Sequence, residues 1–214
     1  MSDTFRVSDI FIMNVIIETN RLLLRTFIID DAPLIYELNL DPELIRYTFD
    51  PIKDIEHARQ VLEQIILPKY ALYNHGRWAV HLKPGLEFIG WCGLKARPER
   101  NKIDLGYRFK RNFWGKGYAT EAAFACIKYG FEKLHLNRII GRSIPDNTAS
   151  LRVLEKCGMT YIGEEVIDGS PPKPTGSSTR SSAEITLQKN QPFNISETFR
   201  ISKIVSIFGI RNQT

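Results

Sequence analysis

Alternating and periodic runs of apolar residues divide the chain into strands and helices. Half-buried or buried strands are predicted at residues 21–27, 78–82, 88–94, 103–109, 138–143 and 160–166. Helices are expected from about 30 to 40, where Asp30, Asp31 and Pro33 suit a helix start, and from 55 to 66. This order of elements predicts a mixed α/β layer structure of the α+β class, in which a central mixed sheet is flanked by helices.

The longest helical pattern follows Gly115. Apolar and small residues recur there with a period of 3.6, at Ala119, Ala122, Ala123, Cys126, Ile127, Gly130, Phe131 and Leu134. Because most of these side chains are small, the helix axis is expected to approach a sheet closely. A shorter helix that ends at Gly158 is predicted between the last two strands of this series.

The chain is interpreted as one domain with additions at both ends. The domain is placed at residues 13–189, after an N-terminal appendage at residues 1–12 and before a C-terminal tail at residues 190–214. Within it, residues 169–182 contain twelve Ser, Pro, Thr or Gly residues out of fourteen, which predicts a flexible loop. Residues 183–188 are expected to form a returning strand.

Composition and charge exclude several classes of protein. The 214 residues carry a formal net charge of +5, which favours an acidic ligand such as a polyanionic small molecule but is too little for a specific nucleic-acid binder. The three cysteines lack C-x-x-C spacing and the four histidines are scattered, so no disulfide framework and no metal site are predicted. The longest apolar run near the N-terminus, residues 10–17, is too short to span a membrane. We expect a reduced, cytoplasmic protein.

One segment carries chemistry: a strand that leads through two glycines into the long helix. Gly115 and Gly117 leave the backbone unobstructed, and the free N–H groups of the first helical turn form a site for an anion such as a pyrophosphate. A P-loop is excluded because Tyr118 follows the second glycine, and a dinucleotide-binding fingerprint fails at Thr120. A plain glycine-rich turn at a helix start remains the alternative.

Three blocks of sequence, in order, resemble the GNAT superfamily of acyl-CoA-dependent N-acetyltransferases. They are residues 18–25 (ETNRLLLR), 113–122 (FWGKGYATEA) and 147–158 (NTASLRVLEKCG). The likeness is greatest to the branch that contains ribosomal-protein N-terminal acetyltransferases and spermidine acetyltransferases, and it covers residues 16–168. It implies the GNAT acyl-CoA N-acyltransferase fold.

The resemblance also implies how acetyl-CoA binds. The pantetheine arm is expected to pair with the backbone of Tyr107, Arg108 and Phe109 like an added strand, and Asn147 is expected to hold the same arm. Lys110, Arg111 and Lys116 are expected around the phosphates, although each is equally interpreted as a solvated surface charge. The pyrophosphate would rest on the N–H groups of Trp114, Gly115, Lys116, Gly117, Tyr118, Ala119 and Thr120.

Two candidate catalytic residues come from the same resemblance. Asp104 stands where some members carry a glutamate that serves as the base, and Ser150 is the candidate acid for the departing thiolate, because Leu154 occupies the position of the tyrosine used by spermidine-type members. Simpler interpretations stay open. Asp104 also suits a carboxylate that faces solvent or an arginine, Asn147 a helix N-cap, and Ser150 a buried small residue.

The function implied is transfer of an acetyl group from acetyl-CoA to a primary amine, either a protein N-terminus or a small amine, by direct attack. The main alternative is a CoA-binding module of the same fold without efficient turnover. A basic nucleic-acid binder is a third hypothesis, which rests on the isoelectric point of about 9.1 alone. The expected partners are acetyl-CoA and the amine acceptor, with no specific nucleic acid and no membrane, and the expected assembly is a monomer or homodimer.

Overall fold

The computed structural model describes residues 14–47, 50–166 and 181–189. In that part of the chain, eight strands form one sheet in the order β1-β2-β3-β4-β5-β6-β8-β7. All neighbouring strands are antiparallel except β5 and β6, which are parallel. The strands are β1 (Val15–Glu18), β2 (Leu22–Thr26), β3 (Arg77–Leu82), β4 (Phe88–Arg97), β5 (Lys102–Phe109), β6 (Arg138–Ser143), β7 (Thr160–Val166) and β8 (Ser181–Gln188).

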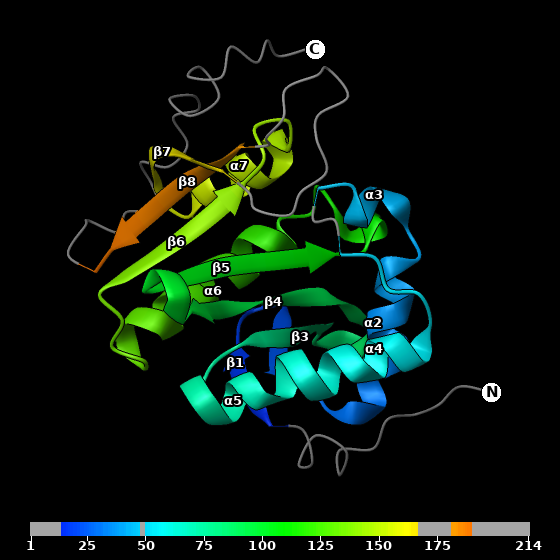
Figure 1. Cartoon of the computed structure of the whole chain (residues 1–214). Helices are drawn as coiled ribbons and strands as arrows, with labels where there is room; N and C mark the ends of the chain where they lie inside the picture. Colours follow the sequence, from blue (N-terminus) through cyan, green and yellow to red (C-terminus); the bar gives the residue numbers. More distant parts are fainter. Residues whose placement is uncertain (1–13, 48–49, 167–180, 190–214) are drawn as a thin grey trace.

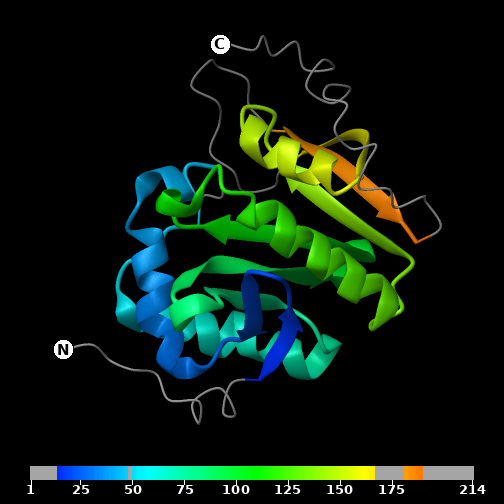
Figure 2. The same ribbon diagram turned by 180° about the vertical axis from the view of Figure 1, so that it is seen from behind.

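Helices cover both faces of the sheet. One face carries α2 (Ala32–Asn39), α4 (Ile55–Val61) and α5 (Leu67–Tyr73), with α3 (Pro42–Ile45) at the end of α2 (Figure 1). The other face carries α6 (Tyr118–Glu132) and α7 (Thr148–Lys156), seen from behind in Figure 2. The predicted mixed α/β layers are therefore confirmed.

Two apolar cores lie on the two faces. The core under α6 and α7 contains Trp78, Cys92 and Leu94 from the central strands, and the core under α2 and α4 contains Phe27, Phe88 and Trp91. Alternate residues of a strand point to opposite faces, so this division fixes the face of every side chain on β3, β4 and β5.

The close approach of α6 to the sheet is confirmed. Ala122, Ala123, Cys126 and Ile127 are fully buried. A Cβ atom added to Gly130 would lie 2.8 Å from the Cδ1 atom of Ile139 and 2.9 Å from that of Leu94, so only glycine fits there without displacing neighbours. The small-residue face therefore lets the helix axis lie close to the strands that hold the site.

Several predicted boundaries differ from the structure. The stretch read as a first strand is preceded by another, β1, and the turn at residues 19–21 joins the two as a hairpin. The helix expected at 55–66 continues through a π-helical turn (Leu62–Ile66) into α5 and ends at Tyr73. The short helix α3 was not predicted.

The expected appendage (1–12), the tail (190–214) and residues 169–180 of the expected loop lie outside the described residues. Ser181 and Ser182, the last two residues assigned to that loop, belong to strand β8 instead. The predicted returning strand at 183–188 is confirmed and pairs with β6 from Ala183 to Gln188; it begins two residues earlier because Ser181 and Ser182 pair with β7.

Candidate active site

The parallel strands β5 and β6 separate partway along their length. They pair at Asp104 with Ile140 and at Leu105 with Gly141, and beyond these positions the two ribbons diverge (Figure 1). A cavity of about 270 Å³ occupies the opening. Its lining includes residues from both faces of the sheet, so it passes through the sheet from the side of α7 to the side of α4 and α5.

The edge of β5 offers backbone groups to this opening. The Lys110 amide donates to the Ile89 carbonyl of β4 at 2.8 Å, and the Arg108 carbonyl lies against Gly90 of the same strand. Because successive residues in an antiparallel ladder face opposite neighbours, the backbone groups of Tyr107 and Phe109 face away from β4, toward the opening. Of the three residues predicted to pair with the pantetheine arm, Arg108 thus directs its backbone to β4.

The glycine loop after β5 ends in the start of α6. Gly115 and Gly117 have φ values of +75° and +80°, a region that L side chains rarely adopt, and Gly117 is the N-cap of α6. The backbone N–H groups of residues 115–120 donate to no acceptor within the described chain. The Trp114 amide differs from the prediction because it donates to the Arg111 carbonyl at 3.0 Å, while the Trp114 indole N–H closes the loop onto the Phe109 carbonyl at 2.7 Å.

Sequence reasoning missed the residues that hold this loop against the β1–β2 turn. The Glu121 carboxylate accepts hydrogen bonds from the Thr19 hydroxyl at 2.6 Å and from the Arg21 backbone N–H at 3.0 Å and Nε at 2.6 Å. Arg21 also donates to the Lys116 carbonyl and lies over the Tyr118 ring at 4.4 Å. Burial raises the pKa of Glu121, but the hydrogen bonds from Thr19 and Arg21 outweigh it and lower the pKa overall.

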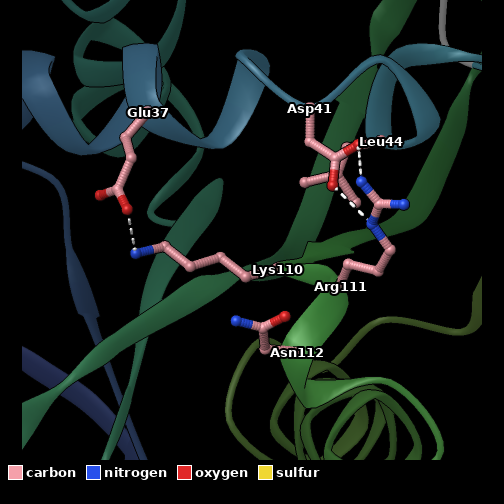
Figure 3. Close-up of a pocket in the computed structure, with 6 residues that line it drawn as sticks. All are labelled: Glu37, Asp41, Leu44, Lys110, Arg111 and Asn112. Carbon is pink, nitrogen blue, oxygen red and sulfur yellow. Dashed lines mark hydrogen bonds and ion pairs between the residues drawn. The ribbon is translucent and has the colours of Figure 1, made fainter.

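The predicted cluster of phosphate-binding cations is divided in the structure. Lys110 pairs with Glu37 of α2 at 2.8 Å, and Arg111 pairs with Asp41, the N-cap of α3, at 2.9 Å (Figure 3). These side chains line a separate cavity of about 460 Å³ between α2, α3 and the loop. Lys116, the third of these cations, is exposed on the glycine loop itself.

Helix α7 places two predicted residues on the cavity. The Asn147 side-chain oxygen accepts from the Ser150 amide at 3.1 Å, so the N-cap interpretation of Asn147 holds, and its side-chain NH₂ makes no hydrogen bond within the described chain. The Tyr107 hydroxyl lies 3.0 Å from the Ser150 carbonyl and 3.1 Å from the Ser150 Oγ. Burial raises the pKa of the Tyr107 phenol. Ser150 therefore has a neutral tyrosine hydroxyl beside it, a contact that sequence reasoning did not foresee.

Asp104 lies on the opposite face of the sheet from Ser150. Its Oδ2 atom accepts from Arg97 Nε at 2.7 Å and from Arg142 Nη2 at 3.1 Å. The alternative reading of this residue, a carboxylate that faces an arginine, thus describes its surroundings. Its role as a base stays a prediction.

The half of the cavity on the face of α4 and α5 is rich in cations. Arg77 of β3 stacks on the Trp91 ring with its guanidinium carbon 4.5 Å from the ring centroid, and the guanidinium carbon of Arg108 of β5 lies 5.8 Å from it. Lys95 of β4 is half-buried in the same lining. Burial, followed by repulsion from Arg77 and Arg97, lowers the pKa of Lys95 to about 8. These cations belong to separate strands and share no sequence motif.

A sequence profile described as Acetyltransferase (GNAT) domain matches residues 21–160, well over half of the chain. The chain belongs to the GNAT acetyltransferases. The recognition and the fold class predicted from the sequence are thereby confirmed, and the family uses acetyl-CoA.

Known GNAT proteins agree in sequence and in structure. An N-acetyltransferase named p20 from Bacillus licheniformis is 36% identical over 147 residues, which cover 68% of this chain and 82% of the relative. The crystal structure of a GNAT-family acetyltransferase from Bacillus anthracis superposes with a TM-score of 0.67 at 27% identity, over 82% of this chain and 99% of that one. The ribosomal L7/L12 alpha-N-protein acetyltransferase RimL, in complex with coenzyme A, shares the fold with a TM-score of 0.68 at 18% identity, over 81% and 97% of the two chains.

The described part of this GNAT chain contains no group of three or more His, Cys, Asp or Glu side chains arranged to hold a metal ion. None of its helices is long and apolar enough to cross a membrane. Cys92 and Cys126 are buried with their sulfur atoms 3.5 Å apart, and burial raises the pKa of the Cys92 thiol, so neither is placed as a nucleophile.

Proposed function

We propose that the chain transfers the acetyl group of acetyl-CoA to a primary amine, and that the two substrates meet in the cavity between β5 and β6. The observation that carries this proposal is the continuity of that cavity through the sheet. The strand edge whose backbone groups face away from β4 and the N-terminus of α6 lie on one side, and the polar part of the cavity lies on the other. Family membership supports the acetyl donor.

The cofactor is proposed to enter from the face of α6 and α7. Its pantetheine amides pair with the backbone of Tyr107 and Phe109, and the Asn147 side-chain NH₂ provides a further donor. The pyrophosphate lies on the N–H groups of residues 115–120, where the α6 dipole also favours negative charge. The coenzyme A bound to RimL supports this use of the same fold.

The reaction requires that a proton leave the amine, that the developing oxyanion be stabilised and that the departing thiolate be protonated. The amine nitrogen attacks the thioester carbon, the carbonyl oxygen becomes an oxyanion that accepts from a strand N–H, and the C–S bond then breaks to release a thiolate. We assign Ser150 to give a proton to this thiolate, beside the Tyr107 hydroxyl. Asp104 lines the same cavity and is assigned to take the amine proton through water.

The proposal predicts acetyl-CoA-dependent thiol release that requires an amine. Thiol release is measured with a chromogenic thiol reagent across a panel of small amines and peptides with free N-termini, and mass spectrometry of the acceptor confirms one added acetyl group for each thiol. Because the fold neighbour RimL is named for a ribosomal-protein α-amine, peptides belong in the panel. Binding of acetyl-CoA without release for any amine would instead support the CoA-binding module.

A further inference from the structure

The acceptor side of the cavity has an unusual balance of charge. Among the described residues that line the cavity, five are cationic and two are carboxylates, and all seven lie on or beside the face of α4 and α5. The cations are Arg77, Lys95, Arg97, Arg108 and Arg142, and the carboxylates are Asp50 and Asp104. The side toward α7 is lined by neutral residues such as Ser143, Asn147 and Ser150. The charge excess is thus confined to the half where the amine is proposed to bind.

Both carboxylates are already engaged by arginines. Asp104 bridges Arg97 and Arg142, and Asp50 pairs with Arg108, which also donates to Asn39 at 2.8 Å. These pairs connect β4, β5 and β6 and hold their guanidinium groups in place. Two of the five cations of the lining, Arg77 and Lys95, take no part in these pairs.

Arg77 and Lys95 make no ion pair within the described chain. The Arg77 guanidinium rests on the Trp91 ring, which orients it but does not neutralise it. Burial lowers the pKa of Arg77; the charge of Asp50 opposes this shift and the nearby Arg108 adds to it. Burial and the charge of Arg77 lower the pKa of Lys95 in turn. Two half-buried cations that repel each other and the neighbouring arginines, and that are in an ion pair with neither carboxylate of the lining, form a place where an anion is stabilised.

We propose that the acceptor amine carries an anionic group, a carboxylate or a phosphate, which binds between Arg77 and Lys95 while the amine faces the thioester. This inference rests on the proposed acetyl transfer and names the class of its second substrate. Arg77 offers paired N–H donors that match a carboxylate or phosphate, and Lys95 adds a point charge.

The same field disfavours other acceptors. A polyamine would bring two or more positive charges into a lining that already has a formal excess of three. A single ammonium is also disfavoured relative to the neutral amine, and the neutral amine is the nucleophile. We therefore expect polyamines to be poor acceptors, although spermidine acetyltransferases belong to the branch that the sequence resembles.

The test compares matched acceptors that differ by one charge. One arm uses peptides with the same N-terminal residue and either Asp or Asn at the third position. A second uses amino acids against their amides and aminoalkyl phosphates against alkyl amines, and a polyamine completes the set. The arms separate a peptide source of the anion from a small-molecule source. In the preferred arm, we expect kcat/KM to be at least about tenfold higher for the anionic acceptor than for its neutral counterpart. A hydrogen bond to a charged group contributes enough binding free energy for a ratio of this size.

Three variants locate the effect. Arg77→Gln and Lys95→Gln each remove one cation from the lining, and Lys128→Gln removes one from the exposed side of α6. The ratio of kcat/KM between anionic and neutral acceptors should fall about tenfold in the first two and stay constant in Lys128→Gln, which shares their change in net charge. Because Arg77 and Lys95 lie on different strands, one variant still tests the proposal if the other fails to fold.

The outcomes separate the two proposals. Thiol release that is equal for both members of every pair, or higher for the polyamine, overturns the anionic acceptor and leaves acetyl transfer standing. An unchanged ratio in both cavity variants also overturns it. Failure of every amine to release thiol overturns the proposed function itself, and the acceptor class with it.

Discussion

The two halves of the central cavity offer different chemical groups to the two substrates that we propose for them. On the side of α7, the lining offers backbone N–H and C=O groups of β5, an asparagine amide and hydroxyl groups, and the glycine loop adds exposed amides of residues 115–120. On the side of α4 and α5, it offers guanidinium groups held in ion pairs or on an indole ring, and the ammonium group of Lys95. We therefore propose that the first half binds the cofactor through backbone groups, with little dependence on side-chain identity, and that the fixed charges of the second half select among acceptors.

The largest effect is expected from a substitution that alters only the cofactor half, which is the α7 side of the cavity together with the glycine loop. Gly117→Glu puts a side chain and a negative charge where the pyrophosphate is proposed to lie, so coenzyme A binding should be abolished in a calorimetric titration. The positive φ of +80° at this position adds a strain of about 1–2 kcal/mol.

Gly85→Glu is the matched control for that strain. Gly85 has a φ of +76° and open space around its Cβ position, in a turn between β3 and β4. It should lose similar stability and keep its affinity for coenzyme A. Equal affinity in the two variants would remove the glycine loop from the cofactor site.

The next largest effect concerns protonation of the departing thiolate, where the cofactor and the acceptor are proposed to meet. Ser150→Ala removes the hydroxyl assigned to protonate the thiolate, and we expect kcat to fall about a hundredfold with an almost unchanged Kd for coenzyme A. Thr148→Ala removes a hydroxyl from the same helix at a position that does not line the cavity, and its kcat should match the wild type. If Ser150→Ala turns over at the wild-type rate, Ser150 has no part in the mechanism.

The smallest effect follows from the ionisation of the acceptor half. Lys95 is cationic below its pKa of about 8 and neutral above it. The preference for an Asp-containing peptide over its Asn counterpart should therefore weaken as the pH rises through 8, by about threefold to tenfold for the loss of one charge contact. The ratio cancels the ionisation of the shared N-terminal amine. In Lys95→Gln this dependence should be lost, and its persistence there would assign it to another group.

The same contrast explains what could be predicted from the sequence. The cofactor half comes from one continuous segment, so the strand at 103–109, the glycines at 115 and 117 and the following helix could be read together. The resemblance to the family then supplied the geometry. The predicted N-terminus of the long helix, its small-residue face and the cap at Asn147 all correspond to short-range patterns.

The acceptor half could not be predicted because the sheet register creates it. Arg77, Lys95, Arg108 and Arg142 come from four strands and meet only when those strands pair. The partners of Asp104 and the contact of Tyr107 with Ser150 are likewise tertiary. The hydrogen bond between Arg21 and Glu121 joins residues 100 positions apart. The ion pairs of Lys110 with α2 and of Arg111 with the N-cap of α3 depend on how those helices pack.

A crystal structure of the protein with coenzyme A bound tests the central claim most directly. The account predicts that the pantetheine amides pair with the backbone of Tyr107 and Phe109, that the pyrophosphate lies on the N–H groups of residues 115–120, and that the thiol points into the cavity between β5 and β6. Phosphates bound at the Lys110–Arg111 cavity, or on Arg77 and Lys95, with the strand edge left free, would contradict it.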